Sequence, residues 1–259
     1  MKLIAFLKSI NPFGKDIFGH FNFIKRMIIS ILGFSTFRGL NIANKTKVEG
    51  TEFLSKLPQK NVLFVSNHQT YFKDVIAISH VFSSVKWGFK NNIKNPIFFL
   101  APRVNTYFIA AKETMKSGFL PKIFEYAGSV SIKRTWREAG KDIKRKVEST
   151  DISNIKKALA SGWVITFPQG TTEAFAPARV GTAHIISTCK PIVVPVVIDG
   201  FRKAFDKKGL QLKEKGTELS IKFKEALNYD NCKNSDELLE LIMDAIEQSS
   251  KYAPSVSAS

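Results

Sequence analysis

The sequence predicts a single α/β domain in which a mixed, mostly parallel sheet is flanked by helices, with a basic amphipathic helical segment ahead of it. The chain has 259 residues, 44% of them hydrophobic, which suits one domain with a sizeable core. Strand-length apolar runs alternate with helical stretches, a pattern typical of a largely parallel sheet. Residues 1–47 carry eight Lys and Arg against one acid, Asp16, which distinguishes them from the domain expected at 48–248.

The N-terminal segment, residues 1–47, has the periodicity of an amphipathic helix. Its apolar residues recur at spacings of four, three, four and three, namely Ile17, Phe21, Ile24, Ile28 and Ile31. Pro12 and Gly14 separate this stripe from a shorter apolar stretch at residues 3–7. Two basic amphipathic helices of this kind are typical of segments that lie in an anionic membrane interface. The alternative is that the stripe packs against the domain's own core.

Six apolar runs within the domain are expected to form strands. They occupy residues 61–66, 107–111, 129–132, 164–167, 192–198 and 219–223. Helices are expected at 74–82 and 153–161, and a further amphipathic helix after Ser235, whose side chain suits an N-cap. The stretch 86–107 mixes aromatic and basic residues, and is equally compatible with a membrane-facing insertion and a surface loop. Residues 249–259 are small and polar, so we expect a flexible tail.

The composition indicates an anionic partner. The net charge is +17 and the pI is near 9.8, which fits nucleic acid, an anionic membrane surface or a phosphorylated substrate. Zinc-ligand spacing, an RNP-type aromatic motif and a basic recognition helix are all missing from the sequence, so nucleic acid is not expected. Cys189 and Cys232 are too few for a disulfide framework and are expected to be free thiols. With no run of eighteen apolar residues and no good signal peptide, we expect a cytoplasmic protein.

The most informative stretch follows the first of these strands and runs from Asn67 to Asp74. It contains His68 and Asp74, the parts of a general base and the carboxylate that orients it. Asp74 is the only acid between Glu52 and Glu113, so the sequence around His68 offers no other partner. The competing interpretation is a capped helix start beside a histidine that is satisfied within the fold.

Three later blocks favour the chemical interpretation. Residues 127–134 form a strand that ends in Lys133 and Arg134. Another strand leads into the run Phe167, Pro168, Gln169, Gly170 and Thr171, after which come Arg179 and the Val-Pro strand at 191–198. In order and rough spacing, the four blocks resemble the motifs of the 1-acylglycerol-3-phosphate acyltransferase family of glycerolipid biosynthesis. The resemblance covers roughly residues 48–225, and the chain would be a divergent, bacterial-type member.

The resemblance implies an O-acyltransferase that moves a fatty acyl group from acyl-CoA or acyl carrier protein to a hydroxyl of a lysolipid. It implies that His68 is the general base, that Asp74 holds it, and that no acyl-enzyme forms. Backbone N–H groups near Gly170 and Thr171 would stabilise the oxyanion. The substrate-binding residues would be Lys112, Arg134, Phe167, Pro168, Gln169, Gly170, Thr171 and Arg179. No cofactor and no metal are implied, and the two arginines suit phosphate groups.

The family works on acceptors embedded in a bilayer, so the resemblance places the protein peripherally on the cytoplasmic face of the inner membrane. The expected partners are a membrane lipid acceptor, the anionic membrane surface and an acyl carrier protein. The default acceptor is 1-acylglycerol-3-phosphate, and a lyso-aminolipid is the alternative. A hypothesis of another class, a non-catalytic basic protein that binds membranes or nucleic acid, is supported by the net charge alone.

Three departures from the family's motifs bear on the acceptor. Five residues, not four, separate His68 from Asp74. Gln169 stands where the family has glutamate, and Thr172 stands where it has arginine. A carboxylate and a phosphate ligand are therefore lost together. The segment around Lys112 and Glu113 also comes later after the histidine block than is usual in the family.

Overall fold

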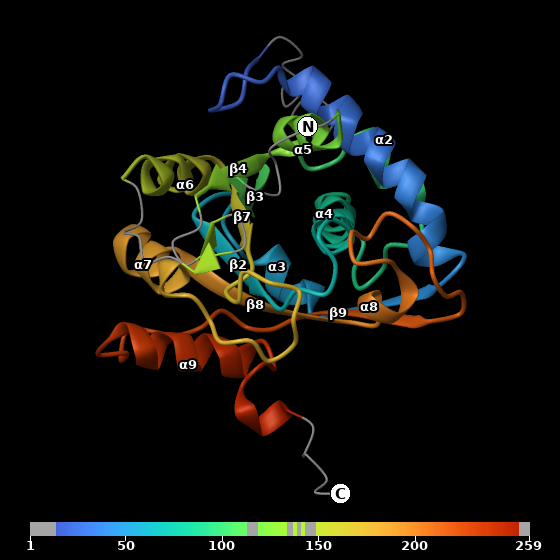
Figure 1. The fold of residues 1–259 in the computed structure, drawn as a ribbon. Helices are drawn as coiled ribbons and strands as arrows, with labels where there is room; N and C mark the ends of the chain where they lie inside the picture. Colours follow the sequence, from blue (N-terminus) through green and yellow to red (C-terminus); the bar gives the residue numbers. More distant parts are fainter. Residues whose placement is uncertain (1–13, 113–118, 134–136, 139–140, 143–148, 254–259) are drawn as a thin grey trace, which may run out of the picture.

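A computed structural model describes residues 14–112, 119–133, 137–138, 141–142 and 149–253. Its centre is a seven-stranded sheet in the order β1-β9-β8-β2-β7-β3-β4, flanked by helices on both faces (Figure 1). Strands β8, β2, β7, β3 and β4 run parallel to one another, and β9 pairs antiparallel with β8. The predicted single α/β domain with a mostly parallel sheet is therefore confirmed.

Six of these strands are the predicted ones. They are β2 (Val62–Ser66), β3 (Thr106–Ala111), β4 (Ser129–Ile132), β7 (Trp163–Thr166), β8 (Ile192–Asp199) and β9 (Glu218–Phe223). The seventh, β1 (Lys45–Glu49), was not predicted and pairs parallel with β9 at the sheet edge. A separate two-residue ladder joins β5 (Arg137–Glu138) to β6 (Lys141–Asp142).

Two apolar cores cover the two faces of the sheet. On one face lie α2 (Asn22–Asn41), α3 (Thr51–Ser55), α4 (Lys73–Lys86) and α5 (Phe119–Ala127), with the 3-10 turn η1 (Pro96–Leu100). On the other lie α6 (Ser149–Ser161), α7 (Val180–Cys189) and α9 (Ser235–Ala245). The predicted helices at 74–82 and 153–161 correspond to α4 and α6. Strands β2, β7 and most of β8 are buried on both sides, which explains their unbroken apolar runs, whereas β9 is buried at alternate residues.

From residue 14 on, the N-terminal segment packs against the rest of the domain. Helix α2 packs on α5, η1, α4 and β1, and the expected boundary at 47/48 falls inside β1. Lys25, fully buried on α2, donates to Asp16 over 3.1 Å and lies over the Tyr107 ring. The single acid of the segment therefore neutralises the buried lysine that contacts Tyr107 of β3. Ile17 and Phe21 precede α2, whereas Ile24 and Ile31 lie exposed on it; the stretch 3–7 and Pro12 lie outside the described residues.

The C-terminal helix begins at the predicted place with a different cap. The side chain of Asn234, not Ser235, accepts from the Asp236 and Glu237 N–H groups. Ser235 is the first helical residue, because Asn234 has the extended backbone that an N-cap requires. Beyond α9, residues Ser250–Tyr252 form the 3-10 turn η3 within the expected tail, and 254–259 lie outside the described residues.

Candidate active site

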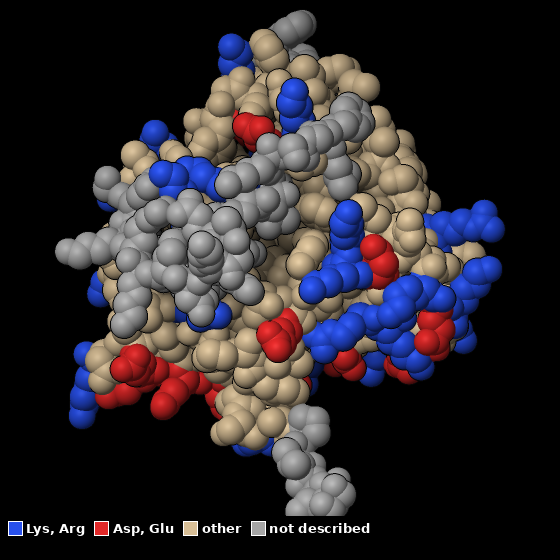
Figure 2. Space-filling model, viewed as in Figure 1, with Lys and Arg blue, Asp and Glu red and all other residues tan. Residues whose placement is uncertain are grey.

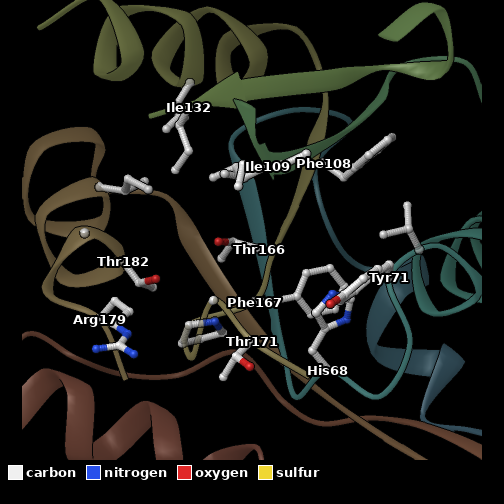
Figure 3. A pocket seen from close by; sticks show the side chains of 18 of the residues that line it. His68, Tyr71, Phe108, Ile109, Ile132, Thr166, Phe167, Thr171, Arg179 and Thr182 are labelled. Carbon is white, nitrogen blue, oxygen red and sulfur yellow. The ribbon is translucent and has the colours of Figure 1, made fainter. Parts of the chain in front are cut away.

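A cavity of about 500 Å³ opens at the carboxyl ends of the parallel strands (Figure 3). Ligands bind at this edge of open parallel sheets because the loops that leave the strands converge there. The loop after β2 contributes His68, and the loop after β7 contributes Phe167 to Thr171. The ends of β3 and β4 supply Ile109 and Ile132. Three of the four sequence blocks therefore converge on one cavity, and the Val-Pro strand, β8, does not line it.

His68 and Asp74 form a direct contact at this cavity. His68 Nδ1 lies 2.9 Å from Asp74 Oδ2, and the Asp74 side chain is fully buried while that of His68 reaches solvent. An ionised carboxylate only accepts hydrogen bonds, so Nδ1 carries the proton that it donates to Asp74. The other ring nitrogen, Nε2, is then free to take a proton from a substrate. The imidazole also stacks on Phe167, with ring centroids 3.8 Å apart, which fixes its orientation.

The extra residue between His68 and Asp74 is absorbed by a turn wrapped around the carboxylate. Asp74 Oδ2 accepts from Gln69 N at 2.6 Å and from Thr70 N at 3.0 Å. Asp74 Oδ1 accepts from Thr70 Oγ1 at 2.6 Å. Because Asp74 sits in the first turn of α4, the helix N-terminus also favours its negative charge. The five-residue spacing therefore keeps the histidine and carboxylate in contact.

The loop after β7 lines the cavity through Phe167, Pro168, Gly170 and Thr171. Gly170 has φ +63°, a left-handed conformation that suits glycine, and this turns the chain back at the cavity floor. Its N–H donates to Phe167 O over 3.0 Å and is occupied within the turn. Of the two expected oxyanion donors, only the Thr171 N–H is without a backbone partner among the described residues.

Gln169 does not line the cavity. Its side chain is 1% exposed, and Nε2 donates to Ala176 O at 2.9 Å and to Gln248 Oε1 at 3.2 Å. Gln248 Oε1 also accepts from Phe175 N at 3.0 Å. The expected substrate-binding role of Gln169 is therefore replaced by a structural one, in which the segment after α9 holds the loop in shape.

The expected cationic residues separate into three cases. Arg179 lines the cavity at the start of α7, and its backbone N–H donates to Pro168 O over 2.8 Å. Lys112 pairs with Asp151 at 3.6 Å, and the aspartate, not the lysine, is part of the cavity wall. Arg134 lies outside the described residues.

Sequence reasoning missed several residues at the cavity. Tyr71 lies beside His68 (Figure 3) and could have been found within the same motif. Lys207 comes from the segment between β8 and β9, which resembles no motif block and therefore gave no signal. An apolar wall deeper in the cavity is formed by Ile109, Ile132, Ile152, Ile155 and Ile185. Among the described residues, no cluster of three or more His, Cys, Asp or Glu could hold a metal ion.

Comparison with known proteins agrees with this geometry. The sequence profile of the Acyltransferase family matches residues 45–199, so the chain belongs to that family and is an acyltransferase enzyme. The crystal structure of the 1-acyl-sn-glycerophosphate acyltransferase PlsC from Thermotoga maritima has a similar fold. The two are 20% identical with a TM-score of 0.55, over 85% of this chain and 76% of that one. No curated protein sequence is recognisably similar to the chain.

Proposed function

We propose that the enzyme transfers a fatty acyl group from an acyl thioester to a hydroxyl of a lysolipid, with 1-acylglycerol-3-phosphate as the first candidate acceptor. The observation that carries this proposal is the His68–Asp74 contact at the mouth of a cavity with an apolar wall. General-base catalysis needs such a pair, and a fatty acyl chain needs such a wall. The family supports acyl transfer as the reaction, and PlsC, which shares the fold, acts on 1-acyl-sn-glycerophosphate according to its name.

In the proposed mechanism, His68 Nε2 accepts the proton of the acceptor hydroxyl while that oxygen attacks the thioester carbonyl carbon. Asp74 accepts a hydrogen bond from the Nδ1–H of the resulting imidazolium and stabilises its charge. The Thr171 N–H would stabilise the carbonyl oxygen as it becomes negative, since Thr171 lines the cavity. When the C–S bond breaks, the thiolate takes the proton back from His68, so no acyl-enzyme and no cofactor are needed. The donor is acyl-CoA or acyl carrier protein.

One observation favours a second acceptor class, a lyso-aminolipid. Glu173 is exposed and lines the cavity, and the position before it is Thr172 in place of the family's arginine. A carboxylate at the mouth suits an ammonium group better than a phosphate. Relative rates on lysophosphatidic acid and on a lyso-aminolipid distinguish the two acceptors.

We further propose that α2 and η1 rest on the membrane that holds the acceptor. Their exposed apolar side chains are Phe23 at 52%, Ile24 at 40%, Met27 at 47%, Ile31 at 62%, Phe34 at 46%, Ile97 at 40% and Leu100 at 65%. Phe34 contacts Phe99 of η1, which joins the two elements into one apolar surface. Among the described residues, no helix is long and apolar enough to cross a bilayer. A surface of this kind supports peripheral binding, and we place it at the cytoplasmic face of the inner membrane.

The mechanism is tested by the variants His68→Ala and Asp74→Asn. We expect His68→Ala to lower kcat by ~10²–10⁴-fold, the usual contribution of a general base. Asp74→Asn should lower it by roughly 10²-fold or more, because the amide no longer fixes the imidazole tautomer. The matched control is His184→Ala, since His184 is exposed on α7. Acyl transfer from labelled acyl-CoA to lysolipids is measured together with thermal unfolding. Near-normal turnover by folded His68→Ala would refute the mechanism.

A further inference from the structure

The segment between β8 and β9 borders the cavity with two bases that no motif block contains. Short helix α8 (Phe201–Ala204) contributes Arg202, and the loop after it contributes Lys207. Figure 2 shows Lys and Arg gathered over α8 and this loop, beside the hollow in the same face. Only Lys207 of the two lines the cavity itself. Their placement relative to His68 is set by hydrogen bonds to the motif loops.

Arg202 is held between the two loops that build the active site. Its backbone N–H donates to Gln69 Oε1 at 3.1 Å. Gln69, next to His68, is itself held by a hydrogen bond from its Nε2 to Asp199 Oδ1 at 3.0 Å. The Arg202 guanidinium donates through Nη2 to the backbone oxygen of Thr172. One of its five N–H donors is thus used to hold the side chain beside residue 172, and the exposed remainder is available to a ligand.

Lys207 lies on a loop that hydrogen bonds hold beside the cavity. Tyr71 N donates to Lys207 O at 3.0 Å, and Phe72 N donates to Lys208 O at 3.1 Å, which joins the loop to the stretch between His68 and Asp74. The Asp206 carboxylate accepts from Leu210 N at 2.7 Å and Gln211 N at 2.8 Å and closes the turn. The backbone that carries the Lys207 ammonium therefore keeps a fixed distance from the catalytic loop.

Neither base has its charge neutralised within the described part of the chain. Neighbouring Lys203 pairs with Glu214 at 3.1 Å, whereas Arg202 and Lys207 form no ion pair there. Asp206 is already occupied by backbone N–H groups, and Glu173 is the nearby acid on the cavity lining. Two unneutralised cations, one of them a guanidinium with free donors, favour a phosphate group at this place.

We propose that Lys207 and Arg202 form a phosphate-binding site at the mouth of the cavity. The proposal rests on the acyl transfer proposed above and deepens it, because a phosphate held here would position the substrate that carries it beside His68. Both substrates can bear such a group: the lysolipid in its head group, and acyl-CoA in its diphosphate. On the acceptor side, Arg202 would return a guanidinium to the neighbourhood of Thr172.

The experiment compares Lys207→Gln and Arg202→Gln with Lys203→Gln, whose side chain already has an acidic partner. Each variant is assayed on lysophosphatidic acid and on monoacylglycerol, and with acyl-CoA and acyl-pantetheine. We expect both test variants to raise KM about 10-fold for the phosphate-bearing member of one substrate pair, with kcat nearly unchanged. The pair that responds identifies the acceptor or the donor as the source of the phosphate. Equal losses with and without phosphate, or no loss, would overturn the site.

Two further measurements distinguish a phosphate site from a membrane-binding surface and from a failure of the proposed function. Calorimetric titration with inorganic phosphate does not depend on turnover, and we expect the wild-type protein to bind it more tightly than the Lys207→Gln, Arg202→Gln double variant. Equal binding refutes the site even if the enzyme acts on other substrates, whereas absent acyl transfer with intact phosphate binding refutes only the proposed function. A loss confined to acceptors in anionic vesicles, and not seen in detergent, would assign both bases to the membrane surface instead.

Discussion

Gln169 shows how one side chain can follow a motif and still serve a different purpose. Its position in the run from Phe167 to Thr171 predicts contact with substrate, but its amide is buried against Ala176 O and Gln248 Oε1. Both partners are acceptors, so they suit the donor nitrogen of an amide at 169, while Gln169 Oε1 is buried without a hydrogen bond in the described structure. The replacement of the family's glutamate thus matches its surroundings in this chain, and Gln248 comes from beyond α9, far outside any motif.

We therefore expect Gln169→Glu to lower both activity and stability. The new carboxylate would face the Ala176 carbonyl oxygen and Gln248 Oε1, at sites now 2.9 Å and 3.2 Å from the amide nitrogen. A buried acceptor without a donor costs about 1–3 kcal/mol, or more when charged. The free energy of unfolding should fall by at least this amount, and acyl transfer by roughly 10-fold as Thr171 loses its fixed position.

The control is Gln211→Glu, the same chemical change at an exposed residue of the loop after α8. It should change the free energy of unfolding by no more than about 0.5 kcal/mol. Denaturant unfolding and acyl-transfer rates are measured for both variants. Wild-type stability and activity in Gln169→Glu would show that the loop tolerates a carboxylate and that the described hydrogen bonds do not hold it.

Among the elements, α4 connects the active site to the N-terminal helix. Its first turn carries Asp74, and further along it His80 is buried beneath α2. His80 Nε2 lies 3.0 Å from Thr36 Oγ1, which in turn donates to Leu32 O at 2.6 Å. Nε2 is therefore the protonated nitrogen, and Nδ1 is buried without a hydrogen bond in the described structure. Burial, with the nearby Lys73 charge as a second cause, lowers the pKa of His80 to about 3.

A lowered histidine pKa makes the fold weaker in acid. Between pH 6.5 and pH 3 the unfolded state binds a proton at this position and the folded state does not, so the free energy of unfolding decreases as pH falls. From pH 7.5 to pH 5.5 the His80 contribution should decrease by about 1.4 kcal/mol. His80→Gln keeps a donor for Thr36 and removes the titration, so its stability should depend less on pH. Denaturant unfolding of both proteins at the two pH values measures the difference, and parallel pH profiles would exclude this role.

Some elements of the fold could be predicted from the sequence and others could not, and the difference has physical reasons. Strands β2, β7 and most of β8 are buried on both faces, and continuous burial leaves an apolar run that is easy to read, while β9 buries Leu219, Ile221 and Phe223 in alternation. Strand β1 lies at the edge, where alternate residues face solvent, and three of its five residues are Lys45, Lys47 and Glu49. His68 and Asp74 lie in one short motif, so their pairing could be predicted. Lys207, Arg202 and Gln248 reach the site from segments distant in sequence, and local patterns say nothing of such contacts.

Over the whole molecule, the parallel strands direct their carboxyl ends to one edge of the sheet, where the cavity lies. Helix α2 lies on one face of that sheet with an apolar outer side, and its inner side is fixed by Lys25 and Asp16. The predicted stripe of Ile17 to Ile31 thus describes only part of the exposed surface. Phe23, Met27 and Phe34 extend it along the helix, and η1 broadens it. The insertion at 86–107, left open between a loop and a membrane contact, supplies the exposed Ile97 and Leu100.

We expect this surface to bind vesicles that contain anionic lipid, and the triple variant Phe23→Ser, Ile31→Ser, Leu100→Ser to bind them less tightly. These side chains are 52%, 62% and 65% exposed, so their loss should leave the core intact. Burying the exposed part of each in lipid contributes about 1 kcal/mol, so affinity should fall on the order of 100-fold. Tyr252→Ser, on η3, is the control, because Tyr252 is 40% exposed and outside this surface. High salt should weaken wild-type binding without abolishing it, since only the charge contribution is screened. In co-sedimentation, a triple variant that pellets like the wild type would place the membrane contact elsewhere on the protein.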